Sequence, residues 1–297
     1  MYTELAPKIY FVEGENRGNY PYSNSLLIDD KKKVLIDTGT GTGRNRQIAH
    51  DFNIDLVLMS HAHEDHIAGN PVFPGAKIAA HKNTAPAIRR VQKIVEQCGV
   101  KGTDAEKLIY DLFNNFYQLG DSRVDLEFED GEYFNLGNHE LIAIHTPGHS
   151  AGHCCFNLPT AGLIFLSDIE LSSFGPYYGN EDSDINSFLE SIERVKKLSY
   201  ETAVSAHKGI FCGRDHILDN LDRYRDIIFE RESTLLKFLE RERTIDEIVD
   251  QSIICDTSLQ PKALFKIVEI IMVRKHLELM LNKNLVTVSS GHYIKAD

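Results

Sequence analysis

Short apolar runs, separated by turns rich in glycine, aspartate and asparagine, make up most of the first two thirds of the chain. Runs of four or five residues have the length of buried strands, and helical stretches lie between them. This alternation predicts an α/β protein in which sheets and helices form layers. Nine segments are predicted strands: 8–12, 25–28, 33–36, 56–59, 77–80, 140–144, 154–157, 163–166 and 202–205.

The stretch from 84 to 118 follows a different periodicity. Ile88, Val91 and Val95 recur at helical spacing, and a second series of this kind ends at Phe116. We therefore predict a pair of helices inserted between two strands, where it serves as packing surface.

Beyond residue 214 the pattern becomes helical and highly charged. Ile217 and Leu221 mark one helix face, Leu264 and Val268 mark another, and the end of the chain alternates like a hairpin. Helix, helix, helix, hairpin is the order of a winged-helix domain. We predict two domains, 1–214 and 215–297, with the helical insertion at about 84–118 inside the first.

The composition is that of an ordinary globular protein, since 42% of its 297 residues are hydrophobic and 26% are charged. The net charge of −12 disfavours binding to nucleic acid or to anionic lipid. Five cysteines, an odd number with no C-x-x-C pair, are typical of a reducing compartment. No apolar run reaches the ~20 residues of a membrane span, and no signal peptide is recognised, so a cytoplasmic location is predicted.

The hexapeptide from His61 to His66 reads His-Ala-His-Glu-Asp-His and directly follows a predicted strand. Open α/β sheets present their ligand sites at such strand ends. Imidazole and carboxylate groups together suit zinc, iron or manganese. Three further candidate ligands also follow predicted strands: His149, Asp168 and His207. The sequence therefore predicts a metal site at one sheet edge.

These motifs together resemble the metallo-β-lactamase-fold hydrolases. The resemblance rests on H-x-H-x-D-H, on Thr-Pro-Gly-His-Ser-Ala-Gly-His at 146–153, on the strand-end Asp168 and His207, and on an earlier strand ending in Asp37-Thr-Gly. It covers about 8–215 and implies a four-layer αβ/βα sandwich with a dinuclear site at one edge. Two departures, Ser-Ala after His149 and Ala-His-Lys-Gly around His207, remove no ligand.

The resemblance also implies a role for each matching residue. One metal ion would be held by His61, His63 and His149, the other by Asp65, His66 and His207, with Asp168 bridging the two. Asp37 would orient ligands without binding metal, and His153 is a candidate for a similar supporting position. Glu170, two residues beyond Asp168, is assigned a structural role.

The predicted chemistry follows from two divalent cations, with zinc preferred over iron or manganese. Two cations that share a water bring its pKa from 15.7 towards about 7 and give hydroxide at neutral pH. Asp65 would orient this nucleophile and receive its proton, so that no serine or cysteine nucleophile is needed. Tyr177 and Tyr178, on a Gly/Pro loop after Asp168, would either shape the substrate site and donate a proton or simply pack the loop.

The leading functional hypothesis is a hydrolase of a small ester, thioester or lactone, similar to the glyoxalase-II and lactonase branches. A phosphodiesterase or endoribonuclease is the alternative, but residues 216–297 carry 12 Lys/Arg against 14 Asp/Glu and lack a basic footprint. A partner-binding regulatory protein is a third possibility, against which the complete ligand set argues. A diiron reductase is a fourth, although similar proteins have Glu where this chain has His63.

The expected partner is a small-molecule substrate, with neither nucleic acid nor membrane. If the chain forms a homodimer, the helical insertion or the C-terminal domain would supply the contact.

Overall fold

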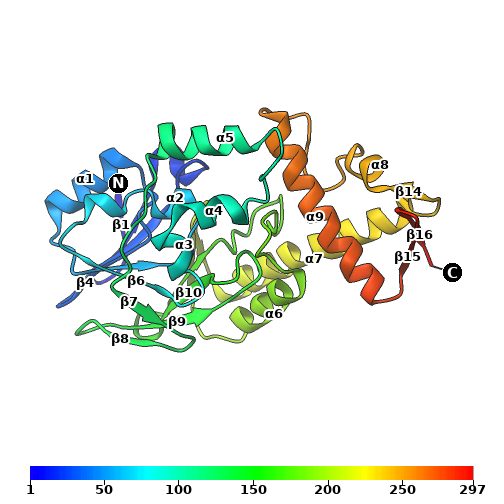
Figure 1. Cartoon of the computed structure of the whole chain (residues 1–297). Coiled ribbons are helices and arrows are strands. Elements are labelled where there is room, and N and C mark those ends of the chain that lie inside the picture. Colours follow the sequence, from blue (N-terminus) through cyan, green and yellow to red (C-terminus); the bar gives the residue numbers. More distant parts are fainter. Residues whose placement is uncertain (297) are drawn as a thin grey trace.

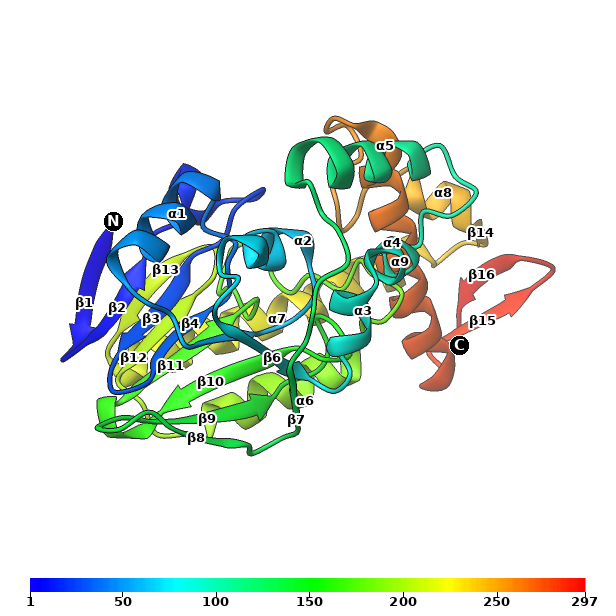
Figure 2. The same ribbon diagram turned by 60° about the vertical axis from the view of Figure 1, so that its left-hand side comes forward.

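Two mixed β-sheets face each other in the computed structural model, which describes residues 1–296 (Figures 1 and 2). The first sheet has the order β1 (Tyr2–Ala6), β2 (Ile9–Val12), β3 (Ser25–Asp29), β4 (Lys33–Ile36), β5 (Leu56–Met59), β6 (Lys77–His81) and β7 (Leu126–Phe128). The second has the order β13 (Gly209–Cys212), β12 (Thr202–Ser205), β11 (Leu163–Ser167), β10 (Cys154–Leu158), β9 (Glu140–His145) and β8 (Tyr133–Asn135). All nine predicted strands are present, each within one residue of its expected ends.

The direction of the strands brings the loops that carry the predicted metal ligands to one edge of the two sheets. The strands β4, β5, β6 and β7 run parallel to one another, and β11 runs parallel to β12. The strand β9 also shares the direction of β11, because both pair antiparallel with β10. The carboxyl ends of parallel strands meet at the same edge of a sheet, and the loops after them can therefore converge.

Side chains that point alternately to the two faces of each sheet form three apolar layers, one between the sheets and one on the outer face of each sheet. Leu26, Ile36 and Leu58 point between the sheets, where they meet Phe156 and Phe165 of the second sheet. Neighbouring residues on the first sheet pack outward against α1 (Thr42–Asp51) and the helical insertion, and those of the second pack against α6 (Ile185–Lys196) and α7 (Arg214–Phe238). Burial on both faces explains the continuous apolar runs in the sequence. The predicted order helix, sheet, sheet, helix is confirmed.

The insertion between β6 and β7 is more broken than the predicted pair of helices. It comprises α3 (Ala85–Arg89), α4 (Val91–Gln97), α5 (Glu106–Asp111) and the π-helical turn η3 (Leu112–Tyr117). Arg90 is extended and ends α3, and Gly99 and Gly102 adopt positive φ values of 66° and 76° between α4 and α5. These left-handed conformations interrupt the helix at positions that glycine tolerates.

The C-terminal elements lie at one end of the molecule (Figure 1). They comprise α7, α8 (Ile245–Val249), α9 (Lys262–Asn282) and a small sheet of order β14 (Arg243–Thr244), β16 (His292–Lys295) and β15 (Val286–Ser289). The short strand β14 adds to the predicted helix, helix, helix, hairpin order. Residues of α6, α7 and α9 share one apolar cluster, so the C-terminal helices pack directly onto the layer behind the second sheet. The division at 214/215 stays a prediction.

The remaining short elements are η1 (Glu15–Gly18), α2 (Glu64–Ile67), η2 (Asn70–Val72) and η4 (Pro159–Ala161). Among residues 1–296, no helix has both the length and the apolar character to cross a membrane.

Candidate metal centre

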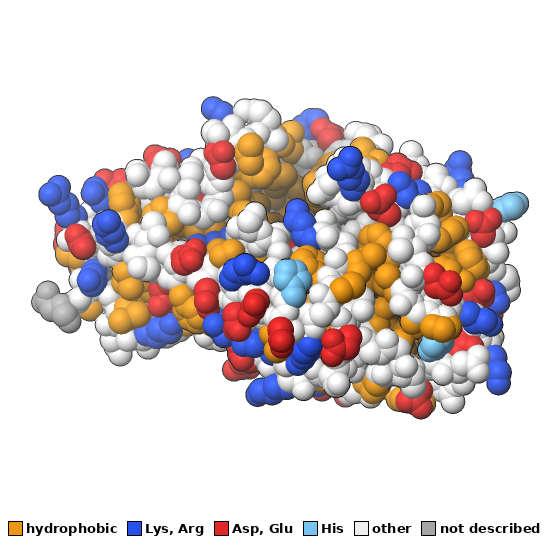
Figure 3. All heavy atoms as spheres, turned by 180° about the vertical axis from the view of Figure 1, so that it is seen from behind, with side chains coloured by type: hydrophobic (Ala, Val, Ile, Leu, Met, Phe, Trp, Pro, Cys, Tyr) orange, Lys and Arg blue, Asp and Glu red, His pale blue; other side chains and the backbone are white. Residues whose placement is uncertain are grey.

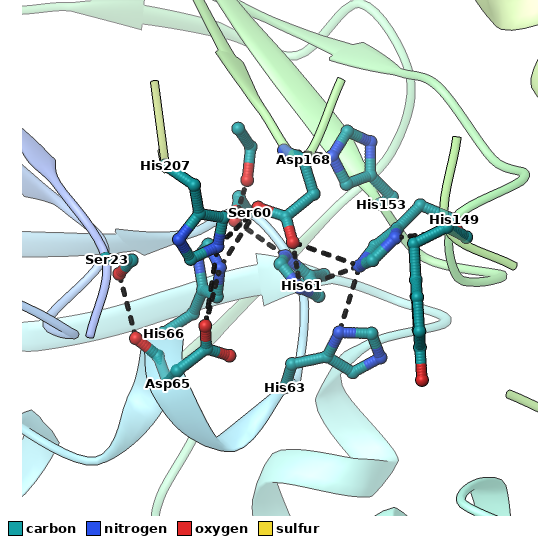
Figure 4. A network of polar contacts seen from close by, with 12 residues as sticks. Ser23, Ser60, His61, His63, Asp65, His66, His149, His153, Asp168 and His207 are labelled. Atoms are coloured by element: carbon teal, nitrogen blue, oxygen red, sulfur yellow. Dashed lines mark hydrogen bonds and ion pairs between the residues drawn. The ribbon is translucent and has the colours of Figure 1, made fainter. Parts of the chain in front are cut away.

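The seven predicted ligands come from four separate loops and converge at one edge of the sandwich (Figure 4). The loop after β5 and the short helix α2 supply His61, His63, Asp65 and His66. The other three follow β9, β11 and β12: His149, Asp168 and His207. Each strand is held rigidly within a sheet, and the side chains at its end therefore have fixed positions.

Three histidines and one oxygen of Asp168 form the first group. Nε2 of His149 lies 3.3 Å from Nε2 of His61 and 2.9 Å from Nδ1 of His63. Oδ2 of Asp168 lies 3.2 Å from Nε2 of His149 and 3.7 Å from Nε2 of His61. These four side chains surround a point that could accept one metal ion.

The second group contains Asp65, His66 and His207 together with the other oxygen of Asp168. Oδ1 of Asp168 lies 3.1 Å from Nε2 of His66 and 3.6 Å from Nε2 of His207. Oδ2 of Asp65 lies 3.4 Å from Nε2 of His207. The two oxygens of Asp168 thus face different groups, and Figure 4 shows this carboxylate between them. Such a carboxylate can bridge two ions.

Hydrogen bonds fix which ring nitrogen is free in three of these histidines. Nδ1 of His66 contacts Oδ2 of Asp37 (2.8 Å), and Nδ1 of His149 and of His207 contact the carbonyl oxygens of Tyr177 (3.1 Å) and Gly18 (2.7 Å). Carboxylate and carbonyl oxygens only accept, so Nδ1 donates in each case. The Nε2 lone pairs are therefore directed into the shared centre, as in metal-binding histidines.

In His61, the hydroxyl of Ser60 determines which ring nitrogen carries the proton. The Ser60 hydroxyl donates to Oδ2 of Asp37 (2.6 Å), because a carboxylate cannot donate. Its oxygen is then free to accept from Nδ1 of His61, at 3.0 Å. Nε2 of His61 consequently also carries a lone pair.

Two buried acceptor atoms that face each other indicate that this cluster can bind a metal ion. Among the described residues, Nε2 of His66 and Oδ1 of Asp168 are buried without a hydrogen-bond donor. They lie 3.1 Å apart, although each offers a lone pair to the other. Two acceptors at this distance repel unless a proton or a cation lies between them. The donor set of imidazole and carboxylate groups suits zinc, iron or manganese.

The two groups differ in charge. Burial lowers the pKa of His61 and His149 well below the usual range, which keeps both rings neutral. Burial acts in the same direction on His66, but Asp168, Asp65 and Asp37 outweigh it and raise the pKa of His66 well above its usual value. Burial also lowers the pKa of His207, but the negative charge of Asp168 outweighs this effect and raises the pKa to about 9. The second group thus attracts positive charge more strongly than the first.

Asp37 lies behind the second group, where the sequence predicted an orienting residue. Its carboxylate accepts from the amide of Ser60 (2.8 Å), from the Ser60 hydroxyl and from Nδ1 of His66. Its φ angle is +60°, and Ser167, whose hydroxyl donates to Ser60 (2.8 Å), has a φ of +50°. Left-handed conformations of non-glycine residues store strain and cluster at functional sites.

His153 is turned away from the two groups. Its Nδ1 contacts the Thr146 carbonyl oxygen (3.0 Å), and its Nε2 accepts from the backbone amide of Asp168 (3.1 Å). His153 therefore contacts the backbone of Asp168, and its supporting role stays a prediction.

The two tyrosines have different surroundings. Tyr177 is half-buried, and its ring centre lies 5.8 Å from that of His149. Tyr178 is fully buried, and its hydroxyl contacts Arg231 and His276 of the C-terminal helices. This placement argues against Tyr178 as a proton donor to substrate, because its hydroxyl is held by α7 and α9 and points away from the ligands.

Sequence reasoning missed the residues that orient the histidines. Ser60 and the carbonyl oxygens of Gly18 and Tyr177 hold Nδ1 atoms, and the Asn180 side-chain amide contacts Nε2 of His63 at 2.5 Å. Carbonyl oxygens carry no side-chain signal in a sequence. Glu170 lies close enough to Asp168 and His207 for all three to share an ion.

A cavity of about 240 Å³ opens beside Asp65. Tyr22, Phe116 and Tyr117 line one part of it, and the glycine-rich segment 39–43 lines another. The centre is therefore adjacent to space in which a small molecule could bind.

Residues 19–207 match the sequence profile of the metallo-beta-lactamase superfamily. The chain belongs to this superfamily. Its buried cluster of histidines and aspartates is typical of the dinuclear site of this superfamily.

Similar curated proteins include thioester hydrolases. An atrochrysone carboxyl ACP thioesterase from Cryptosporiopsis sp. is 23% identical over 250 residues, which cover 80% of this chain and 65% of that protein. The hydroxyacylglutathione hydrolase of Francisella tularensis subsp. novicida is 25% identical over 220 residues, covering 72% and 69%. The chain spans about three fifths of the length of the fungal thioesterases it matches.

Solved structures share the fold over nearly the whole chain. A metallo-beta-lactamase family protein from Thermus thermophilus superposes with a TM-score of 0.72 at 20% identity, covering 98% of this chain and 100% of that one. A beta-lactamase domain protein from Burkholderia ambifaria gives 0.74 at 15% identity, covering 99% and 93%. The coverage includes the C-terminal helices.

Proposed function

We propose that this metallo-beta-lactamase superfamily hydrolase cleaves thioesters of small acyl groups, with activated esters and lactones as further substrates. The observation that carries the proposal is the Asp168 carboxylate between two groups of histidines. In four of them, His61, His66, His149 and His207, the contact made by Nδ1 leaves Nε2 facing inward. The distant similarity to ACP thioesterases and to a hydroxyacylglutathione hydrolase supports the substrate class.

The proposed ligand assignment follows the two groups. His61, His63 and His149 would hold one divalent ion, Asp65, His66 and His207 the other, and Asp168 both. Zinc is preferred, with iron or manganese as alternatives, since imidazole and carboxylate suit all three. Two such ions, when bound, lower the pKa of a shared water towards about 7 and stabilise negative charge on the substrate oxygen.

Asp65 has the position required of a proton acceptor. One of its carboxylate oxygens faces His207, the residue borders the cavity, and its backbone carbonyl accepts from the Ser23 hydroxyl (2.8 Å). In the proposed reaction Asp65 orients the attacking water and takes its proton. Water adds to the acyl carbon, the carbon–sulfur bond breaks, and the thiolate leaves and can take up the proton that Asp65 holds.

The leaving group favours a thioester. A thiol has a pKa of about 8.5, so a thiolate departs near neutral pH, whereas an alkoxide usually requires a proton donor. Tyr178 is unsuited to that task, because its hydroxyl is committed to Arg231 and His276. The small cavity with aromatic lining beside Asp65 suits a compact acyl group.

Charge argues against a polyanionic substrate. The net charge is −12, and on the face drawn in Figure 3 the Lys and Arg side chains are interspersed with Asp and Glu. A nucleic-acid site needs a concentrated basic footprint. We therefore propose neither nucleic acid nor membrane as a partner.

The remaining expectations stay predictions. The five cysteines are free thiols, which supports a reducing compartment and the proposed cytoplasmic location. A homodimer through the insertion or the C-terminal domain likewise remains a proposal.

The test is a substrate panel on zinc-loaded protein. It compares a small acyl thioester with the oxygen ester of the same acyl group, a lactone, a phosphodiester and single-stranded RNA at 150 mM salt. We expect turnover of the thioester to exceed that of the matched oxygen ester, and Asp65→Asn to lose most of its turnover on both. Cleavage of RNA with the thioester untouched would overturn the proposed class and favour a nuclease. Protein that binds no metal in metal-replete medium would refute the ligand assignment itself.

A further inference from the structure

The loop at 174–180 joins the metal centre to the C-terminal helices. On its inner side, the carbonyl oxygen of Tyr177 accepts from Nδ1 of His149 (3.1 Å), and the Asn180 amide contacts Nε2 of His63 (2.5 Å). These are two of the three histidines of the first group. The position of this loop therefore affects the orientation of both rings.

On its outer side the same loop is held by Arg231 of α7, which is only 6% exposed. Its Nη1 donates to the carbonyl oxygen of Pro176 (2.7 Å) and to the Tyr178 hydroxyl (2.9 Å), and its Nη2 donates to the carbonyl of Phe174. The guanidinium also lies over the Phe174 ring, 4.7 Å from its centre. A planar fork of donors is suited to fixing several backbone acceptors at once.

The helix α9 adds one attachment to the loop, at Tyr178, and one just beyond it, at Ser183. The Tyr178 oxygen accepts from Arg231, and its hydroxyl then donates to Nε2 of His276 (2.8 Å), which is fully buried. Lys275 donates to the carbonyl oxygen of Ser183 (2.6 Å), whose hydroxyl in turn donates to the carbonyl of His149 (2.8 Å). Thus α7 and α9 hold the loop from behind.

The two histidines of the second group are oriented from elsewhere. His66 is held by Asp37 at the end of β4, and His207 by the carbonyl oxygen of Gly18. Within residues 1–296, the polar contacts of these two side chains involve neither the loop at 174–180 nor α7 and α9. The histidines of the two halves are therefore oriented by different parts of the chain, while Asp168, which both halves share, accepts from the Tyr224 hydroxyl of α7 at its carbonyl oxygen (3.3 Å).

We propose that Arg231 is a positioning residue for the first half of the metal centre. It holds the loop at 174–180 against α7 and α9, so that Tyr177 and Asn180 orient His149 and His63. The inference rests on the ligand assignment proposed above. It gives the C-terminal segment a role in the centre: one half of the metal site is completed by helices outside the strand-end motifs.

The test measures metal content and affinity in Arg231→Met, which keeps an unbranched side chain and removes the donors. We expect one of two zinc ions to bind at least ~10-fold more weakly, as for other losses of a ligand's orienting partner. Turnover should fall at limiting zinc and recover when zinc is added. Arg231→Lys, with one charged donor group, should fall between Arg231→Met and the parent.

A matched control separates positioning from stability. Leu235→Ala removes a fully buried side chain from the next turn of α7, which contributes packing and no donor to the loop. It should lower the Tm while both ions bind as in the parent. Combining Arg231→Met with His207→Ala, which disables the second half, should abolish tight zinc binding.

The outcomes are distinct. Two ions bound with parental affinity in Arg231→Met would overturn the inference, whatever the change in Tm. If Arg231→Met does not fold, Arg231→Lys keeps the charge and loses the fork of donors, and it should still weaken one ion several-fold; unchanged affinity there would also refute the inference. If the parent itself binds no metal, the proposed function fails.

Discussion

Replacing Asp37 by asparagine tests whether this residue controls the proton on His66. The carboxylate accepts three hydrogen bonds, from the Ser60 amide, the Ser60 hydroxyl and Nδ1 of His66. An amide has one accepting oxygen, so its NH₂ group must face at least one of these donors. The backbone is not expected to change, because asparagine tolerates the φ of +60° found here.

Two consequences can be given magnitudes. Loss of one buried, charge-assisted hydrogen bond should lower the free energy of unfolding by about 1.5–3 kcal/mol. If the NH₂ group faces His66, the ring must accept at Nδ1 and carry its proton on Nε2. That proton would point at Oδ1 of Asp168, 3.1 Å away, and occupy the lone pair needed by the ion. We expect the affinity of one ion to fall ~10–100-fold, as for other partners of metal-bound histidine.

The assay is zinc titration against a competing chelator, with thermal unfolding in parallel. Asp30→Asn is the matched control: Asp30 is 3% exposed and accepts bonds from Lys31, Asn138 and His139, none of which belongs to the centre. It should lose stability but bind both ions normally. The reasoning is refuted if Asp37→Asn binds two ions with parental affinity, or if Asp30→Asn loses an ion to the same degree.

Three further predictions address the centre directly. Asp65→Asn should keep the fold but lower kcat by about 10²–10⁴-fold, because an amide cannot take a proton from water; near-normal turnover would remove Asp65 as the base. Asp168→Ala should lose more, since ions about 3.5–4 Å apart repel without a bridging anion, and elemental analysis should find fewer than two ions per chain. Zinc affinity should rise from pH 6 to pH 9, because the pKa of His207 is about 9 without metal and that of His66 is also raised, so that binding must displace protons from both rings. A flat profile in chelator competition would contradict this origin.

The strands illustrate why much of the fold could be read from the sequence. Segments such as Leu56–Met59 are apolar throughout because both faces of their sheet are covered, and turn residues mark their ends. The helical insertion was less predictable. Its apolar spacing is helical, but that spacing does not indicate that Arg90 is extended or that Gly99 and Gly102 adopt positive φ.

The sequence by itself determined which side chains can meet. Placing the histidines and aspartates directly after strands commits them to one edge, because strand direction and pairing leave the ends of β5, β9, β11 and β12 together. Their convergence is therefore a property of local pattern and sheet geometry.

Only the tertiary structure decided how those side chains are turned. His207 is oriented by the carbonyl of Gly18, 189 residues away in sequence, and Tyr178 is drawn to His276, 98 residues away. Backbone carbonyls leave no mark in the residue pattern, and a buried hydroxyl bonds to whichever partner packing brings near. Ring tautomers and side-chain direction depend on such contacts between distant segments, which exist only once the layers have packed.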